Sequence, residues 1–158
     1  MRIGIGYDIH RFGEEGQLIL GGVTFADRPG LAGHSDADVL IHAIMDAIFG
    51  AAGLGDIGQH FPPDDPGYAG ADSSDLLAAC LLIVKEKGLK VDSLDTTVIA
   101  EYPKLGPRVH EIRAKIASLL GASVDHVNVK ATTNEGIGAI GRGEGIAAMA
   151  VALLSESR

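Results

Sequence analysis

Residues 2–12 alternate in character and constrain the fold more than any other segment of the chain. Isoleucine or tyrosine occupies the odd positions from 3 to 9, whereas glycine, aspartate or histidine occupies the even positions from 4 to 10. Successive side chains of a strand point to opposite faces, so this period of two predicts a β-strand. Asp8 and His10 then leave the same face of that strand. The chain must therefore build a sheet, and one of its strands carries two potential metal ligands side by side.

The rest of the chain predicts four further strands and three helices. Strands are expected at 18–25, 91–102, 127–133 and 145–155, and helices at about 38–53, 73–87 and 107–120. Gly21 and Gly22 break the second strand, which is expected to pair with the first as a hairpin. The order β-β-α-α-β-α-β-β predicts an α/β (α+β) sandwich, in which a mixed sheet has its helices packed on one face.

Capping residues and breakers predict where the helices and loops begin and end. Asp36 or Asp38 is expected to cap the first helix, and Ser73 or Ser74 to start the second. Glycines at 53, 88 and 121 supply the stops. Residues 55–71 are rich in glycine, proline and aspartate, and a loop of that length in a compact domain tends to be functional or mobile.

Length and composition predict one domain over residues 1–158. Hydrophobic residues make up 46% of the chain and charged residues 22%, which allows a hydrophobic core and excludes a disordered chain. Aromatic residues make up only 4%, so the core must be aliphatic and rich in alanine. Because small side chains bury less area per residue, such a domain is expected to gain stability by self-association as a homo-oligomer.

Charge and hydropathy argue against several classes of protein. The net charge of −8 leaves no basic stripe to neutralise phosphates, which argues against a nucleic-acid partner. The longest apolar runs are too short or too polar to cross a bilayer. Met1 and Arg2 lead straight into a strand pattern, unlike a signal peptide, and the single cysteine, Cys80, has no partner for an internal disulfide. These features predict an acidic protein of the cytoplasm.

Asp8 and His10 suggest a zinc site, to which the first helix would supply a third ligand. Zinc accepts imidazole nitrogen and carboxylate oxygen, and three protein ligands with an open position are typical of a catalytic zinc. His42 lies outside the apolar stripe of its helix, with Asp38 and Asp46 one turn to either side, where a carboxylate could fix its tautomer. The alternative is a surface Asp-x-His pair and a solvated histidine. Spacing alone leaves both interpretations open.

His34 and Ser35 come just before the first helix and suggest an anion site. A phosphate there would meet backbone N–H groups at the positive end of the helix and two side-chain donors. The simpler interpretation is that Ser35 and Asp36 only cap the helix, and these residues by themselves favour it.

Residues 130–145 contain five glycines and follow a predicted strand. Glycine lets backbone N–H groups approach an anion, and Thr132, Thr133 and Arg142 add donors. The segment matches neither the dinucleotide fingerprint nor the Walker loop, and a bulge and turn region is an equally good interpretation. Glu135 beside a phosphate would need a bridging hard cation, for which Mg²⁺ is expected.

Five motifs in order resemble one family over essentially the whole chain, the 2-C-methyl-D-erythritol 2,4-cyclodiphosphate synthases of the non-mevalonate isoprenoid pathway. The motifs are GYDIHRF from residue 6, LAGHSDADVLIHAIMDA from 31, GLGDIGQHFPPDDP from 53, IAEYPKLGP from 99 and VNVKATTNEGIGAIGRGEGIA from 127. Five motifs in the right order are far more specific than any one of them.

The resemblance implies an assembly, a reaction and two metals. The family forms a homotrimer whose sheets face the threefold axis and whose active sites lie between neighbouring subunits. Its enzymes, phosphorus–oxygen lyases, convert 4-diphosphocytidyl-2-C-methyl-D-erythritol 2-phosphate into 2-C-methyl-D-erythritol 2,4-cyclodiphosphate and CMP, by attack of the 2-phosphate on the β-phosphate. The resemblance implies one zinc ion or other divalent metal per subunit on Asp8, His10 and His42, with Mg²⁺ or Mn²⁺ joining Glu135 to the substrate diphosphate.

The resemblance also implies roles for individual residues. His34 and Thr133 match positions that stabilise the transition state, and Ser35 matches the position that holds the 2-phosphate. The other expected substrate contacts, besides the metal ligands, are Asp56, Gly58, Phe61 and Asp65 for ribose and erythritol, Ala100, Pro103, Lys104, Leu105, Gly106, Ala131 and Thr132 for cytosine, and Arg142 for charge.

Two positions depart from the family pattern. Pro63 stands where aspartate is frequent, which leaves the erythritol hydroxyls to Asp64, Asp65 or the backbone. Ala139 stands where an aromatic residue often lines an axial cavity near Arg142, so the pattern does not decide whether an isoprenoid diphosphate binds there, where Arg142 could still supply charge.

Two other functions compete with the synthase. A zinc-dependent phosphohydrolase could use the same ligands on another diphosphate, but it would need a general base poised on water, and the sequence offers no obvious one. A non-catalytic, trimeric nucleotide-binding module would make the three ligands incidental. The lack of a transit-peptide pattern favours a bacterial cytoplasm, or a plastid stroma if such a peptide has been removed.

Overall fold

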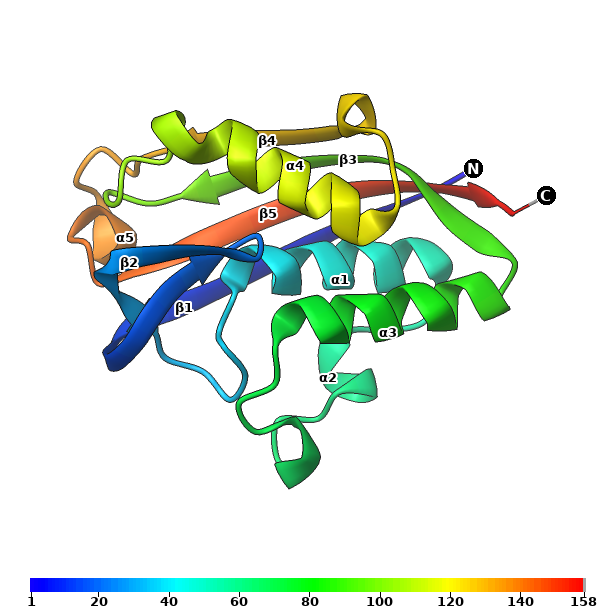
Figure 1. Ribbon diagram of the computed structural model, residues 1–158, viewed down its shortest axis with the longest axis horizontal. Coiled ribbons are helices and arrows are strands. Elements are labelled where there is room, and N and C mark those ends of the chain that lie inside the picture. Colours follow the sequence, from blue (N-terminus) through cyan, green and yellow to red (C-terminus); the bar gives the residue numbers. More distant parts are fainter. Residues whose placement is uncertain (158) are drawn as a thin grey trace.

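The computed structural model describes residues 1–157 and shows one sheet with helices along one side (Figure 1). The strands are β1 (Arg2–Leu20), β2 (Val23–Leu31), β3 (Leu89–Ile99), β4 (Val127–Thr132) and β5 (Gly145–Glu156). The helices are α1 (Val39–Ala52), α2 (Ile57–His60), α3 (Ser73–Glu86), α4 (Val109–Leu120) and α5 (Gly138–Gly141), with the 3₁₀ turns η1 (Pro66–Tyr68), η2 (Gly106–Arg108) and η3 (Val124–His126).

The strands lie in the order β2-β1-β5-β3-β4. β1 pairs antiparallel with β2 and with β5, and β3 pairs antiparallel with β5. β3 and β4 run parallel because α4 carries the chain back between them. The mixed sheet and the predicted order of five strands and three long helices are therefore confirmed.

The structure corrects several predicted boundaries. Gly21 and Gly22 form the turn of the β1–β2 hairpin and do not interrupt a strand, so β1 continues to residue 20. Asp38, and not Asp36, caps α1. Helix α3 begins at Ser73, as predicted, and Asp72 is its cap. The expected loop at 55–71 contains α2 and η1.

Helix α1 lies directly on β1 at two glycines. A Cβ atom on Gly4 would come 2.1 Å from the carbonyl oxygen of Ala47, and one on Gly6 would come 2.0 Å from that of Ala43. No side chain fits into this space, so these even positions of β1 are glycine because a helix backbone covers them. This close approach sets the distance between β1 and α1, the two elements that carry the predicted ligands.

Helix α1 is also the centre of the core. Among its 14 residues, His42, Asp46 and Gly50 are the three that are not buried. The buried set includes Leu40, Ile41, Ile44, Met45 and Ile48, the apolar stripe that the sequence predicts. Within residues 1–157, no helix has both the length and the apolar character needed to span a membrane.

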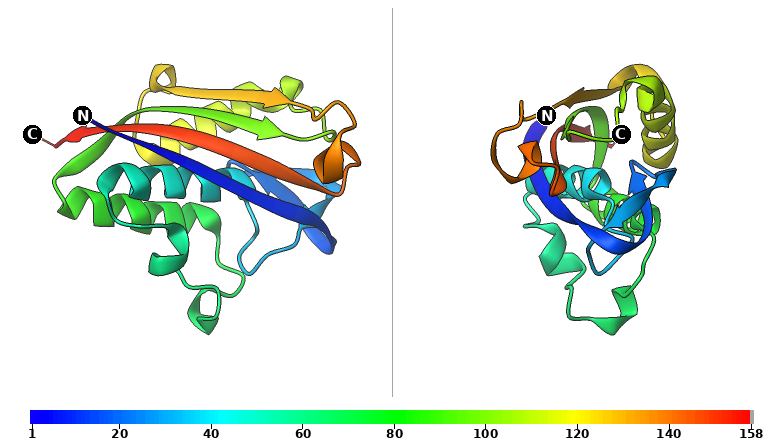
Figure 2. Two further views of the ribbon diagram at one scale, coloured as in Figure 1. Left: turned by 180° about the vertical axis from the view of Figure 1, so that it is seen from behind. Right: turned by 90° about the vertical axis from the view of Figure 1, so that its left-hand side faces the viewer.

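The odd positions of β1 face away from the helices and form an exposed apolar surface with β5. Figure 2 shows this side of the sheet from behind, with the strands in front of the helices. The surface consists of Ile3, Ile5, Tyr7, Ile9, Met149 and Val151, which are exposed by 72, 65, 54, 48, 41 and 37%. An apolar patch on this scale is typical of a surface that another protein chain covers.

Candidate metal centre

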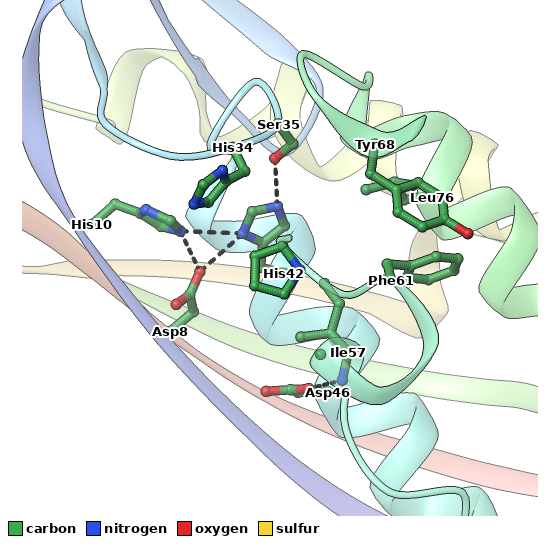
Figure 3. Close-up of a pocket in the computed structure, with 12 residues that line it drawn as sticks. Asp8, His10, His34, Ser35, His42, Asp46, Ile57, Phe61, Tyr68 and Leu76 are labelled. Atoms are coloured by element: carbon green, nitrogen blue, oxygen red, sulfur yellow. Dashed lines mark hydrogen bonds and ion pairs between the residues drawn. The ribbon is translucent and has the colours of Figure 1, made fainter. Parts of the chain in front are cut away.

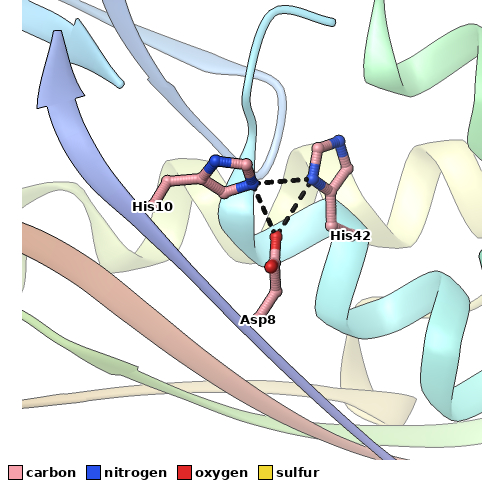
Figure 4. Close-up of side chains that lie close together, drawn as sticks. All are labelled: Asp8, His10 and His42. Carbon is pink, nitrogen blue, oxygen red and sulfur yellow. Dashed lines mark hydrogen bonds and ion pairs between the residues drawn. The ribbon is translucent and has the colours of Figure 1, made fainter. Parts of the chain in front are cut away.

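Asp8, His10 and His42 converge on one point between β1 and α1 (Figure 4). Nε2 of His10 lies 2.8 Å from Oδ2 of Asp8, and Nδ1 of His42 lies 3.0 Å from the same oxygen. The two facing imidazole nitrogens are 3.2 Å apart. One ligand atom from each residue lies within 4.8 Å of the others, so the group is able to hold a metal ion. The predicted two-ligand strand and its helical third ligand therefore come together.

Local structure on both sides of the group places its side chains. The carboxylate of Asp38 caps α1 through the N–H groups of Leu40 and Ile41, and it also accepts hydrogen bonds from Gly21 and Gly22 in the hairpin turn. One buried carboxylate thus joins the start of α1 to the hairpin, one helical turn before His42. Burial raises the pKa of Asp38 to about 6.

Hydrogen bonds and charges within the group shift the pKa values of Asp8 and His10. Burial tends to raise the pKa of Asp8, but the hydrogen bonds and positive charges of His10 and His42 outweigh it and hold that pKa well below its usual range. The hydrogen bond that His10 donates to Asp8 in turn raises the pKa of His10, against the opposing effect of burial. A carboxylate that stays ionised beside two imidazoles suits a divalent cation.

The outer nitrogen of each imidazole also has a partner. Nδ1 of His10 lies 2.7 Å from the carbonyl oxygen of Ala32, which accepts its proton and leaves Nε2 to face the centre. Nε2 of His42 lies 3.1 Å from the hydroxyl oxygens of both Ser35 and Ser73. Both rings are therefore held with the inward nitrogen available to a metal.

The sequence interpretation of the acids around His42 is wrong. Asp38 is engaged by four backbone N–H groups, and Asp46 accepts a hydrogen bond from the N–H of Ile57 at 2.8 Å. The groups that contact the outer nitrogen of His42 are serine hydroxyls that come from before α1 and from the start of α3.

A cavity of about 240 Å³ opens beside the metal ligands (Figure 3). Polar groups gather at one end, and Ile57, Phe61, Tyr68 and Leu76 line the other. The lining contains Asp8, His10, His34, Ser35, His42, Asp46, Ile57, Gly58, Phe61, Pro63, Tyr68 and Leu76. Such a cavity suits a small ligand with a charged end and an apolar end.

Of the four expected ribose and erythritol contacts, two line this cavity and two do not. His34, Ser35, Gly58 and Phe61 lie in it together with the three metal ligands. Asp56 instead caps α2, and Asp65 caps η1. The sequence interpretation did not assign Ile57, Tyr68 or Leu76 to the cavity. A possible signal was their apolar character next to the glycine- and proline-rich loop.

A second cavity, of about 360 Å³, lies at the ends of β3 and β4. It is lined by Ala100, Pro103, Lys104, Leu105, Gly106, Pro107, Val109, Ala131, Thr132 and Thr133. All the residues expected to contact cytosine line it, together with Thr133 and with Pro107 and Val109, which were not predicted. The two cavities share no lining residue.

Backbone N–H groups of the glycine-rich segment bind a carboxylate of the same chain, where the sequence suggested an external anion. Oε1 of Glu101 accepts hydrogen bonds from the N–H groups of Asn134 at 2.9 Å and Gly136 at 3.5 Å. Glu135, between them, has a left-handed φ of 52° and an exposed side chain outside both cavities. Arg142 is also exposed, and its Nε donates to Glu144 at 2.6 Å.

Comparisons with known proteins agree on one family. The model of the YgbB family matches residues 1–155. The 2-C-methyl-D-erythritol 2,4-cyclodiphosphate synthase of Pseudomonas aeruginosa (strain UCBPP-PA14) is 56% identical over 154 residues, which cover 98% of either chain. The synthase of Thermosynechococcus vestitus is also 56% identical, over 98% of this chain and 96% of its own.

Solved structures show the same fold. The Plasmodium falciparum IspF in complex with CDP has a TM-score of 0.85 and 34% identity, over 99% of this chain and 97% of its own. The bifunctional IspDF of Campylobacter jejuni has a TM-score of 0.94 and 42% identity over 98% of this chain. This chain spans 42% of that longer protein.

Proposed function

This chain belongs to the YgbB family, and we propose that it is a 2-C-methyl-D-erythritol 2,4-cyclodiphosphate synthase. It converts 4-diphosphocytidyl-2-C-methyl-D-erythritol 2-phosphate into the cyclic diphosphate and CMP, in the biosynthesis of isoprenoid precursors. The observation that carries this function is the convergence of Asp8, His10 and His42 at the polar end of a cavity, within a chain that matches the named synthases over nearly its full length.

The reaction is an intramolecular transfer with a balanced set of bonds. An oxygen of the 2-phosphate forms a bond to the β-phosphorus, and the bond from that phosphorus to the oxygen bridging the α-phosphate breaks. CMP leaves with the bridging oxygen, so no water is consumed and the enzyme is a phosphorus–oxygen lyase. Such chemistry requires little covalent help from the protein, which contributes positioning and charge neutralisation.

The donor set fits a divalent metal of the zinc type. Two imidazole nitrogens and one carboxylate oxygen are the ligands that catalytic zinc uses, and the cavity lies on their open side. When bound there, zinc would supply polarisation of phosphate oxygens and neutralisation of their charge. Asp8, His10 and His42 would hold it.

The other cavity residues position the substrate. His34 and Ser35 lie beside the metal ligands and donate hydrogen bonds to the transferring phosphate and the 2-phosphate. Phe61 and its apolar neighbours contact the erythritol carbons and keep water away from them. In the second cavity, Pro103, Lys104 and Leu105 contact the cytosine, and Thr133 contacts the diphosphate. Glu135 would hold Mg²⁺ or Mn²⁺, which would supply neutralisation of the diphosphate charge.

The active enzyme is a homotrimer with its active sites between subunits, in the cytoplasm. Two observations support this assembly. The apolar surface on β1 and β5 is left open by a single chain. The metal cavity and the second cavity also share no lining residue, although the diphosphate and the cytosine of one substrate molecule must contact both at once. A neighbouring subunit that brings its second cavity to the metal cavity satisfies both observations.

Phosphorus NMR of the reaction tests the proposal directly. Purified protein with zinc and magnesium is incubated with the diphosphocytidyl substrate, and the products are followed over time. A cyclic diphosphate with an equal amount of CMP supports the synthase. Ring-free phosphates would identify a hydrolase instead, and an unchanged substrate would contradict catalysis of either kind.

A further inference from the structure

Two serine hydroxyls hold His42 from the side opposite the metal, and they differ in their surroundings. Ser35 lines the cavity, as Figure 3 shows, whereas Ser73 is fully buried at the first residue of α3. The hydroxyl oxygens of both lie 3.1 Å from Nε2 of His42. The direction of each hydrogen bond decides which nitrogen of His42 carries the proton.

The hydroxyl proton of Ser73 is committed to Asp36. Oδ1 of Asp36 accepts a short hydrogen bond from the Ser73 hydroxyl, and Oδ2 accepts the Ser73 backbone N–H at 3.1 Å. An ionised carboxylate only accepts hydrogen bonds, so the hydroxyl must donate to it. The Ser73 oxygen is then left to accept the Nε2 proton of His42. With a proton held on Nε2, Nδ1 is the nitrogen that His42 has left to bind a metal beside Asp8 and His10.

Ser35 does not impose this direction. Its oxygen accepts the N–H of Ala37 at 3.2 Å, and no carboxylate among the side chains that the structure describes takes its proton. Its hydroxyl is therefore able to donate or to accept, and it remains available to a ligand in the cavity. Of the two serines, Ser73 is the one whose hydrogen bond with His42 has a fixed direction, because its hydroxyl donates to Asp36.

We propose that Asp36 and Ser73 are positioning residues, which form a carboxylate–hydroxyl–imidazole chain that fixes the metal-binding tautomer of His42. Carboxylates behind metal-binding histidines act in this way in other proteins, and here a serine extends the reach of the carboxylate by one hydrogen bond. The inference rests on the proposed metal site and not on the proposed reaction, so it is tested by metal binding without substrate.

The same residues tie the metal centre to the loop over the cavity. The N–H of Asp36 donates to the carbonyl oxygen of Ala71 at 3.0 Å, and the N–H of Gly70 donates to that of His34 at 2.7 Å. The end of the loop that carries Pro63 and Tyr68 is therefore fastened to the same segment that orients His42.

Three substitutions and one control distinguish a role of the Asp36–Ser73–His42 hydrogen bonds in zinc binding from a general effect on folding. Ser73→Ala removes the hydroxyl but keeps the backbone N–H bond to Asp36, and Asp72 still caps α3. Asp36→Asn keeps the shape but replaces one acceptor oxygen by a donor, which frees the Ser73 hydroxyl to donate to His42. Ser35→Ala removes the other hydroxyl. Asp72→Asn is the matched control, because it makes the same change of charge at an adjacent exposed cap.

Zinc affinity is measured by competition with a chelator, and the tautomer of His42 by ¹⁵N NMR of the metal-free protein. We expect the wild-type His42 to carry its proton on Nε2. Ser73→Ala and Asp36→Asn should weaken zinc binding about 10- to 100-fold and mix the tautomers. Asp72→Asn and Ser35→Ala should leave zinc affinity unchanged.

Each other outcome contradicts the proposal in a distinct way. An Nε2 of His42 that carries no proton in the metal-free wild type would overturn it without any variant, even if one of the variants failed to fold. Unchanged zinc affinity in both Ser73→Ala and Asp36→Asn would also overturn it, and an equal loss in Ser35→Ala would assign the role to Ser35. A wild-type protein that binds no zinc would instead refute the proposed metal site itself.

Discussion

The metal cavity and the second cavity differ in how far one chain completes them. His10 and His42 keep only 19 and 13% of their side-chain surface exposed, and every polar atom in their group has a hydrogen-bond partner in the same chain. Around the second cavity, Ala131 and Thr132 are exposed, and so is Glu135 nearby. In one chain the candidate metal ligands are thus largely enclosed, whereas the lining of the second cavity is partly open to solvent.

This contrast indicates which properties should depend on assembly. A site whose groups are already held in place needs no partner in order to bind, because its ordering cost has been met on folding. Metal binding should therefore be a property of each chain, and binding of the nucleotide a property of the trimer.

His42→Ala should abolish both zinc retention and activity while the trimer persists. Losing one of three ligands removes the metal and with it several kcal/mol of transition-state stabilisation, or about a thousandfold or more in rate. Elemental mass spectrometry and native mass spectrometry on one sample measure metal content and assembly together. Unchanged metal content would contradict the ligand assignment, and loss of the trimer would contradict the independence of the two properties.

Ile5→Asp should weaken nucleotide binding at the second cavity and leave zinc binding at the metal cavity unchanged. The substitution places a charge on the apolar surface of β1 and β5, and burying an unpaired charge costs several kcal/mol, which is enough to dissociate the trimer. Zinc affinity should persist in the dissociated chain. The Kd for CDP should rise by at least about tenfold, because each 1.4 kcal/mol of binding free energy that the neighbouring subunit supplies corresponds to a factor of about ten.

The matched control for this experiment is Leu82→Asp, at a residue of α3 that is exposed by 63% and lies outside that surface. It should leave the trimer and both affinities unchanged. If the dissociated Ile5→Asp chain bound CDP as tightly as the wild type, the second cavity would be complete within one chain. The expected difference between the two cavities would then be wrong.

Gly6→Ala should destabilise the metal region through packing. Its Cβ would come 2.0 Å from the carbonyl oxygen of Ala43, so α1 must move away from β1. Overpacking of this kind costs about 1–3 kcal/mol or more, and each kcal/mol lowers the Tm of a domain of this size by about 2–4 °C. Gly106→Ala, at a residue of the second cavity where no atom of the described chain lies within 4 Å of the added Cβ, is the control for thermal denaturation. An equal Tm for both variants would refute the packing argument.

The sequence suggested Asp8, His10 and His42 as candidate ligands because the relevant signals are local, and the family resemblance favoured them over a surface pair and a solvated histidine. Alternation along residues 2–12 puts Asp8 and His10 on one face, and helical periodicity leaves His42 off the apolar stripe. Alternation also shows that the strand has two faces, but it does not show which one a helix covers. Here the glycine face is covered and the isoleucine face is exposed, which only the packing of α1 on β1 reveals.

The contacts that the sequence did not predict join distant segments. Ser73 lies 31 residues from His42, and its approach depends on how α3 packs beside α1. The nearer acids, Asp38 and Asp46, match the helical spacing but bind backbone N–H groups instead. Spacing identifies candidates on one element, whereas hydrogen bonds between elements are decided by tertiary packing.

Zinc binding should weaken as the pH falls, whereas binding of cytidine should not. The hydrogen bond that His10 donates to Asp8 raises the pKa of His10, so this histidine keeps its proton to a higher pH than a free one. Zinc must displace that proton, so below this pKa the zinc affinity should fall by about tenfold per pH unit. The second cavity is lined by one ionisable side chain, Lys104, and its lining contains no carboxylate or imidazole. Chelator competition and cytidine titration across the same pH series check both, and a flat zinc profile would contradict the shift.

Glu135→Gln should produce the smallest change, confined to the second metal. The backbone at residue 135 is fixed by the hydrogen bonds from Asn134 and Gly136 to Glu101, so the substitution removes a charge and leaves the turn in place. Zinc content should be unchanged, while the Mg²⁺ concentration for half-maximal rate should rise by roughly tenfold, because an amide is a weaker ligand than a carboxylate for this hard cation. Glu144→Gln, which removes an exposed acid paired with Arg142 on the same segment, should leave the Mg²⁺ dependence as it is. An unchanged Mg²⁺ dependence in Glu135→Gln would remove the second metal from this half of the site, and the second cavity would then bind its ligand through the base alone.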